Sequence, residues 1–202
     1  MKLTVPNQLT ILRIALTPVF LYYFLQGTPR GQLISTVIFA IASLTDWYDG
    51  WYARRFGVIT QWGQFMDPLA DKLLVSSALV VFATMHYIKG WMVAIIVFRD
   101  VMVTIIRSYA LWRGKPIVTH IVAKWKTFLQ MVTIAMILIY VNYLNYYGAG
   151  SHTYRMRYTD PIGISMSLVT FLTILSAIIY VRENSRLILQ MLKEALLFPF
   201  RD

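Results

Sequence analysis

The chain has 202 residues, 58% of them hydrophobic, and its mean hydropathy of +0.59 lies well above the range of soluble domains. This composition excludes an ordinary soluble globular protein and predicts an integral membrane protein. Lysine and arginine outnumber aspartate and glutamate by 19 to 9, a bias that suits anionic lipid or phosphorylated substrates better than nucleic acid. Because the chain has no cysteine, disulfides, thiolate catalysis and zinc–thiolate sites are excluded.

Six apolar segments are each long enough to cross a hydrocarbon core of about 30 Å, which takes about 20 helical residues. In chain order they lie near residues 8–26, 33–52, 65–86, 90–112, 125–147 and 162–181. We expect an all-α integral membrane protein with six transmembrane helices, in a single domain that spans residues 1–202. Arg13 and Pro18 interrupt the first segment and no small-x-small cleavage pattern follows it, so we expect a retained helix rather than a signal peptide.

The start of the third helix is open between two alternatives. Either Thr60 caps a helix that begins near Gln61 and kinks at Pro68, or Asp67 caps a helix that begins with Pro68. Both alternatives leave Asp67 and Asp71 near the N-terminal end of that helix.

The distribution of positive charge predicts the orientation in the membrane. One side of the six-helix arrangement carries Lys2, Arg54, Arg55, Lys72, Arg113, Lys115, Lys124, Lys126, Arg182, Arg186, Lys193 and Arg201, and the opposite side carries Arg30, Lys89, Arg155 and Arg157. We therefore expect a multi-pass protein of the cytoplasmic (inner) membrane with both termini in the cytoplasm. The tail at 182–202 is expected to form an amphipathic surface helix, with Leu187, Ile188, Met191, Leu192 and Ala195 on its apolar face.

Four aspartates fall within 26 residues, in a chain that is otherwise poor in carboxylates. Asp46 and Asp49 are three residues apart and Asp67 and Asp71 are four apart, so each pair lies on one face of a helix. Single aspartates are often helix caps or turn residues. Two facing helices, however, would bring all four carboxylates together, and such a cluster beside apolar surface needs a cation. Carboxylate oxygens suit Mg²⁺ or Mn²⁺, so the four together predict a metal site on the cytoplasmic side.

Further charged residues fall inside apolar segments, where they are costly and usually functional. Arg99 and Asp100 are equally consistent with a structural ion pair and with a role in a site. Arg107, Lys124 and Lys126 lie near the cytoplasmic face, where they would bind phosphate, although the positive-inside bias alone would also explain them.

Carboxylates, metal and cations at a cytoplasmic membrane edge indicate phosphoryl or phosphatidyl transfer on a lipid. Two metal ions would neutralise a diphosphate and polarise the phosphorus under attack. The chain has no HxK motif, so direct in-line attack by an alcohol is favoured over a phosphohistidine intermediate. A cation or proton transporter is the non-enzymatic alternative, disfavoured because the sequence has neither a visible repeat nor midplane carboxylates.

A longer pattern surrounds the four aspartates. The pattern D-x2-D-G-x2-A-R-x8-G-x3-D-x3-D is matched by Asp46, Asp49, Gly50, Ala53, Arg54, Gly63, Asp67 and Asp71 without a gap. It resembles the motif of the CDP-alcohol phosphatidyltransferase family. The resemblance implies a six-helix membrane enzyme, often a homodimer, with its active site open to the cytoplasm.

The resemblance also implies roles for individual residues. Asp46 and Asp67 would bridge two Mg²⁺ ions, Asp49 and Asp71 would complete their shells, and Asp71 would also act as general base. The residues implied for CDP-lipid binding are Gly50, Arg54, Thr60, Asn7 and Thr10.

Outside the motif, three segments resemble family members that use CDP-diacylglycerol and sn-glycerol 3-phosphate: Pro6 to Arg13, Arg99-Asp100 with Arg107, and Ala123 to Thr127. The similarity implies that Arg107, Lys124, Lys126 and Arg99 bind the acceptor phosphate. Asp100 stands where glutamate is common and Ala123 where glycine often stands, which leaves inositol phosphate and serine open as acceptors.

Overall fold

The computed structural model describes residues 5–56, 61–114, 121–147, 156–185 and 187–191, and the regular structure in these ranges is α-helical, with no strand. The long helices are α1 (Val5–Leu25), α2 (Pro29–Phe56), α3 (Gln61–Thr84), α4 (Gly90–Trp112), α5 (Ile121–Tyr147) and α6 (Pro161–Glu183). The prediction of an all-α fold is confirmed, and each predicted segment corresponds to one of these helices.

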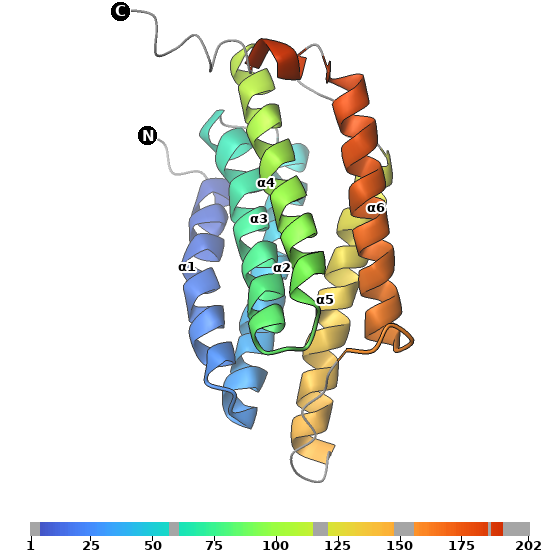
Figure 1. The fold of residues 1–202 in the computed structure, drawn as a ribbon. Coiled ribbons are helices and arrows are strands. Elements are labelled where there is room, and N and C mark those ends of the chain that lie inside the picture. The colour runs from blue at the N-terminus through green and yellow to red at the C-terminus, as the bar shows by residue number, and fades with distance from the viewer. Residues whose placement is uncertain (1–4, 57–60, 115–120, 148–155, 186, 192–202) are drawn as a thin grey trace, which may run out of the picture.

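Successive helices run in opposite directions, so α1, α3 and α5 start at the end of the bundle where α2, α4 and α6 finish (Figure 1). We call this the site end. Helix α1 packs against α2 and α3, α4 packs against α3 and α6, and α5 packs against α6 and α2. The site end thus carries Asp46 and Asp49 from the last part of α2, and Asp67 and Asp71 from the first part of α3.

Glycine and proline explain several helix ends. After α1, Gly27 has a φ of +64° and its N–H donates to the carbonyl of Phe24 at 3.2 Å, a left-handed termination that glycine adopts without steric cost. Gly114 ends α4 in the same way, with a φ of +68°. Helix α6 begins with Pro161, whose missing N–H is not needed in the first turn. Helix α3 begins at Gln61, which confirms the earlier of the two expected starts, and Thr60, its expected cap, lies outside the described residues.

Aromatic side chains dominate the core in the half of the bundle away from the site end. Phe24 of α1 lies 5.2 Å from Phe82 of α3, and Phe20 lies 5.7 Å from Phe39 of α2, measured between ring centroids. These four rings are at most 5% exposed, and tilted aromatic pairs of this kind add to the stability gained from burial. The apolar core therefore holds α1, α2 and α3 together and leaves the site end to polar residues.

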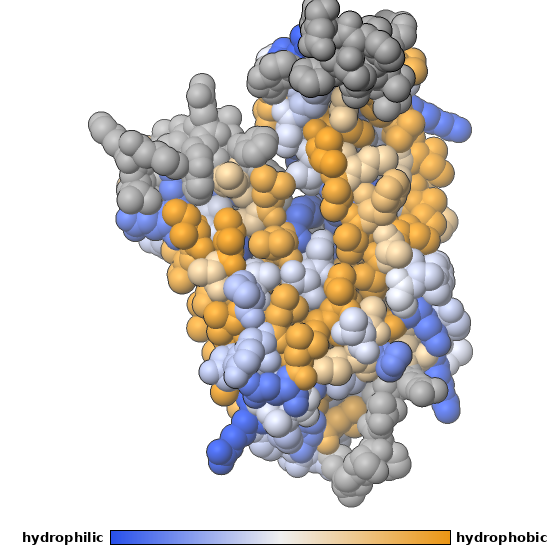
Figure 2. All heavy atoms as spheres, turned by 60° about the vertical axis from the view of Figure 1, so that its left-hand side comes forward, coloured by the Kyte–Doolittle hydropathy of each residue, from blue (hydrophilic) through white to orange (hydrophobic). Residues whose placement is uncertain are grey.

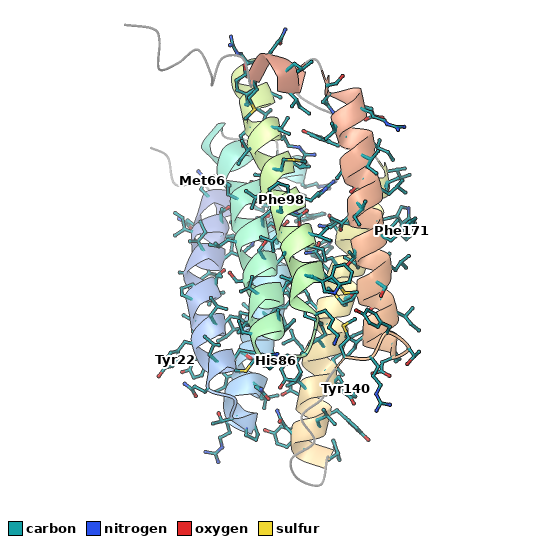
Figure 3. The ribbon with its side chains drawn as sticks, in the orientation of Figure 1. Tyr22, Met66, His86, Phe98, Tyr140 and Phe171 are labelled. Carbon is teal, nitrogen blue, oxygen red and sulfur yellow. The ribbon has the colours of Figure 1, made fainter. Side chains whose placement is uncertain are left out.

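The outer surface carries large apolar side chains on every helix. Tyr22 and Phe171 point away from the bundle (Figure 3), and hydrophobic residues cover much of the middle of the face in Figure 2. A surface of this kind is suited to lipid rather than to water. Among the described residues, three helices are both long and apolar enough to cross a membrane: Asn7–Leu25, Ile121–Tyr147 and Pro161–Glu183. Helices α2, α3 and α4 have the necessary length but carry more charge, so six membrane spans remain a prediction.

Part of the C-terminal tail packs back onto the bundle. Leu187, Ile188 and Met191 contact a buried cluster formed by Val103, Ile106 and Tyr180. Leu192 and Ala195, which were expected on the same apolar face, lie outside the described residues.

Candidate active site

The four aspartates lie close enough to interact. Asp46 interacts electrostatically with Asp49, Asp67 and Asp71, although the pairs come from two different helices. Asp49 is buried, whereas the side chain of Asp46 is 43% exposed. Spacing along α2 and α3 aligns each pair, and the contact of both helices with α1 brings the pairs together.

Arg13 supplies positive charge to the α2 pair. Its guanidinium forms an ion pair with Asp46 and donates from Nη2 to Oδ2 of Asp49 at 2.6 Å. The Arg13 side chain is fully buried, and a buried charge is tolerated only when it is paired and hydrogen-bonded. Arg13 therefore holds Asp46 and Asp49 in a defined position relative to α1.

A polar stripe on α1 extends this contact to the other pair. Asn7, Thr10, Arg13 and Thr17 are all buried and recur at the three- and four-residue spacing of one helix face. Thr10 donates from Oγ1 to Oδ1 of Asp67 at 2.5 Å. The same face of α1 thus binds an aspartate from each pair.

The donor set fits a hard divalent cation, although the carboxylates do not converge in a ready-made cage. In the described part of the chain, no three acidic or histidine side chains form a group arranged to hold a metal. Arg13 pairs with Oδ1 of Asp46 and Thr10 donates to Oδ1 of Asp67, and each carboxylate carries two oxygens that suit such a cation. Four carboxylates facing Arg13 and the neighbouring Lys72 also leave excess negative charge, which favours a divalent cation with oxygen ligands.

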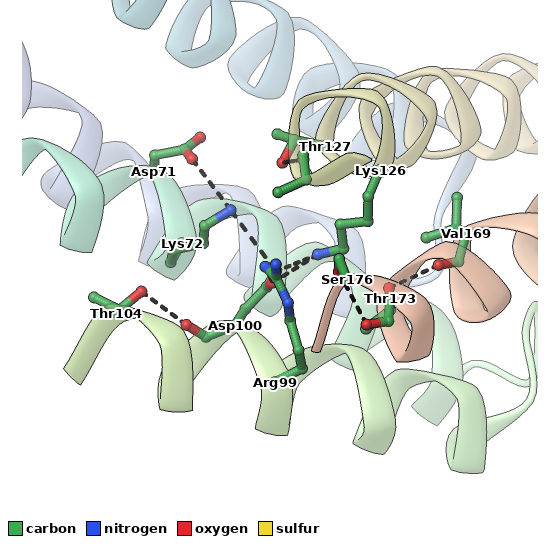
Figure 4. A network of polar contacts seen from close by, with 11 residues as sticks. Asp71, Lys72, Arg99, Asp100, Thr104, Lys126, Thr127, Val169, Thr173 and Ser176 are labelled. Carbon is green, nitrogen blue, oxygen red and sulfur yellow. Dashed lines mark hydrogen bonds and ion pairs between the residues drawn. The ribbon is translucent and has the colours of Figure 1, made fainter. Parts of the chain in front are cut away.

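A second cluster of charges lies deeper in the bundle, around Asp100 of α4 (Figure 4). The side chain of Asp100 is 1% exposed, and Lys126 of α5 donates to both of its carboxylate oxygens at 2.7 Å. Arg99 donates to Oδ1 of Asp100 at 3.1 Å. Arg99 and Lys126, two of the predicted phosphate-binding residues, are therefore brought together by a shared carboxylate.

Lys72 of α3 connects the two clusters. Its Nζ lies 3.7 Å from Oδ2 of Asp71 and 3.7 Å from Oδ2 of Asp100 (Figure 4). A continuous series of charged side chains therefore runs from the aspartates at the start of α3 to Lys126 on α5.

The remaining predicted residues are distributed around these clusters. Arg107 lies two helical turns beyond Arg99 on α4, and both interact electrostatically with Tyr180 of α6. Lys124 is exposed at the start of α5, and Gly50 follows Asp49 within α2. Two residues expected to bind the CDP-lipid cannot be placed: Thr60 and the side chain of Arg54 lie outside the described residues.

A family model described as CDP-alcohol phosphatidyltransferase matches residues 3–159. This chain belongs to the CDP-alcohol phosphatidyltransferase family. The match covers α1 to α5 and ends before α6. Family membership and the apolar helices together make the chain a multi-pass membrane protein, and the family resemblance drawn from the aspartate motif is confirmed.

Several curated relatives of this CDP-alcohol phosphatidyltransferase carry the name CDP-diacylglycerol–glycerol-3-phosphate 3-phosphatidyltransferase. The protein from Bacillus subtilis (strain 168) is 36% identical over 147 residues, which cover 67% of this chain and 76% of the relative. The protein from Rickettsia bellii (strain RML369-C) is 31% identical over 176 residues, covering 87% and 92% of the two chains. The protein from Salmonella paratyphi A is 36% identical over 143 residues, covering 68% and 78%.

Two charged residues of this candidate site were not assigned a role from the sequence. Arg13 is the one charged residue of α1, and its presence in an otherwise uncharged apolar helix was a signal of function. Lys72 directly follows Asp71 and was counted only toward the positive-inside bias, because nothing in the local pattern indicated that its ammonium lies near Asp100.

Proposed function

We propose that this protein transfers the phosphatidyl group of CDP-diacylglycerol to sn-glycerol 3-phosphate, forming phosphatidylglycerophosphate and CMP. The observation that carries the proposal is the meeting of two aspartate pairs with a chain of cations at one end of a membrane bundle. The names of the relatives agree with this reaction.

In the proposed reaction, the primary hydroxyl oxygen of the acceptor attacks the phosphorus that carries the diacylglycerol. The bond from that phosphorus to the CMP oxygen breaks, and CMP leaves with the electron pair of that bond. Asp71 accepts the hydroxyl proton, a role that suits a partly exposed carboxylate, 29% accessible at the side chain, beside the other three aspartates.

Asp46, Asp49, Asp67 and Asp71 would hold two Mg²⁺ ions, with Mn²⁺ as a substitute. When bound, these ions would neutralise the diphosphate of the CDP-lipid and polarise the phosphorus under attack. Arg13 and Thr10 orient the carboxylates on which this depends, since each already contacts an oxygen of the set. Thr10 would therefore act at the CDP-lipid mainly by fixing Asp67.

The substrates would bind on opposite sides of the aspartates. Asn7, Thr10 and Gly50 would hold the CDP-lipid near the start of α1 and the end of α2. Arg54 and Thr60 are assigned to the same substrate by the family resemblance. Arg107, Lys124, Lys126 and Arg99 would surround the acceptor phosphate, since they come from α4 and the start of α5, beyond Asp71. The hydrophilic residues visible in the hollow of Figure 2 are consistent with access for a water-soluble acceptor.

We propose further that the chain is a single catalytic domain that crosses the cytoplasmic membrane six times and forms homodimers, with the site end and both termini in the cytoplasm. The antiparallel order of the helices gathers the starts of α3 and α5, which carry Lys72, Lys124 and Lys126, at the site end. An excess of lysine and arginine is typical of the cytoplasmic side, which supports this orientation.

The decisive experiment supplies purified protein in detergent micelles with CDP-diacylglycerol, MgCl₂ and one acceptor at a time. We expect CMP release and phosphatidylglycerophosphate with sn-glycerol 3-phosphate, and neither with serine or inositol phosphate. CMP release with inositol phosphate alone would assign the site to another acceptor within the same family.

A further inference from the structure

The charge balance around Asp100 favours the binding of an anion in this part of the bundle. Three cations from three helices, Lys72, Arg99 and Lys126, face the single carboxylate of Asp100. Lys72 is shared with Asp71, but in the proposed function the charge of Asp71 is committed to the metal ions. The cluster then has an excess of two positive charges, which equals the charge of a phosphate dianion.

Lys72 and Lys126 differ in how many of their N–H donors are already hydrogen-bonded. Lys126 is fully buried and two of its donors are used by Asp100 at hydrogen-bonding distance. The ammonium of Lys72 lies 3.7 Å from each of its carboxylate partners, which is beyond the 2.7–3.2 Å range of a hydrogen bond, and 22% of its side chain is exposed. With respect to the described residues, its donors are therefore available to an incoming oxygen, and solvent reaches it.

We infer that Lys72 binds the phosphate of the acceptor and thereby holds the attacking hydroxyl next to Asp71, while Asp100 is a positioning residue that fixes Lys72 and Lys126. This inference rests on the proposed function and adds two residues to it. Lys72 is suited to the task because it adjoins Asp71 in the chain and contacts both Asp71 and Asp100. A phosphate bound by Lys72 would lie close to Asp71, so the hydroxyl at the other end of a short acceptor would reach the general base.

The first test compares Lys72→Met with Lys72→Arg and with a matched control, Lys89→Met, which removes an exposed lysine at the opposite end of the bundle. Loss of a charge-assisted hydrogen bond should raise the KM for sn-glycerol 3-phosphate about tenfold to a hundredfold in Lys72→Met. The KM for CDP-diacylglycerol should change less than about twofold, as expected for a site that does not contact this substrate. Lys72→Arg should recover part of the loss, and Lys89→Met should behave as the wild type.

The second test addresses Asp100 through a rescue. Asp100→Asn removes the anchor of both lysines and should weaken stabilisation of the protein by sn-glycerol 3-phosphate, measured as the shift in Tm, even though it increases the net positive charge of the cluster. Asp100→Glu keeps the carboxylate and should restore the shift. All variants should still be stabilised by CDP with Mg²⁺, and this result would show that the aspartate site is folded.

Two results would overturn the inference while the proposed function stands. One is that the wild type is active with sn-glycerol 3-phosphate while Lys72→Met shows an unchanged KM for this acceptor. The other is tighter binding of that acceptor by Asp100→Asn, as simple charge attraction without positioning would give. Lys72 is partly exposed, so Lys72→Met keeps the inference testable even where Asp100→Asn does not fold. A wild type that is inactive with this acceptor would instead contradict the proposed function.

Discussion

Arg13 donates from Nη2 to Oδ2 of Asp49 at 2.6 Å, across 36 residues of sequence, and both side chains are almost completely buried. This contact joins the first helix to the aspartate motif and is the clearest structural reason to include α1 in the proposed active site. For a buried ion pair of this kind, the effect of a mutation is easier to predict than the net contribution of the pair to stability, because removing one partner leaves the other charge buried alone.

Replacement of Arg13 by methionine should destabilise the protein by about 3–5 kcal/mol, because Asp49 would remain as an uncompensated buried carboxylate. Thermal unfolding in detergent with excess chelator should show the loss as a lower Tm. Mg²⁺ should raise the Tm of this variant more than that of the wild type, because a bound cation would replace the missing charge. Arg13→Lys serves as the control, because lysine keeps the positive charge but lacks the planar guanidinium with its several N–H donors. An unchanged Tm in Arg13→Met would show that the pair is dispensable.

Asp46→Asn and Asp67→Asn should each abolish activity, since each removes a charge from the proposed metal ligands. The wild-type enzyme should likewise lose activity in excess chelator and recover it with MgCl₂ or MnCl₂. Asp160→Asn, at the start of α6 and away from the site end, serves as a control and should retain activity. Full wild-type activity in excess chelator would show that the reaction does not need a metal ion.

Asp71→Asn should lower kcat by about 10²- to 10⁴-fold, the usual contribution of a general base. Binding of CDP-diacylglycerol should be affected much less, because the other three aspartates remain. Turnover and equilibrium binding of the CDP-lipid, measured on the same preparation, separate the two effects. Equal losses in both measurements would assign Asp71 to metal binding alone.

Phe24→Ala should cost about 3–5 kcal/mol through the cavity it leaves between α1 and α3. Phe171→Ala removes the same ring from a position that is 62% exposed, and it should change the Tm little. Both variants should keep the wild-type KM for each substrate, because neither residue lies at the site end. A comparable loss of Tm in the two variants would contradict the described packing of α1.

Much of the architecture was predictable from the sequence because helical periodicity and hydropathy are local properties. The six segments corresponded to helices, and the spacing of the aspartates put each pair on one face of its helix. The motif also indicated the family, which the family model confirms. One local question, the start of α3, stayed open because Thr60 and Asp67 are both good caps, and it was decided in favour of the start at Gln61.

The partners of the charges were decided only by tertiary structure. Arg13 pairs with Asp49, Lys126 with Asp100, and Thr10 with Asp67, over separations of 36, 26 and 57 residues. The sequence by itself determined that costly charges would lie within apolar helices and therefore need compensation. Which cation compensates which carboxylate depends on how the helices pack and rotate against one another, and these long-range contacts leave no periodic trace along the chain.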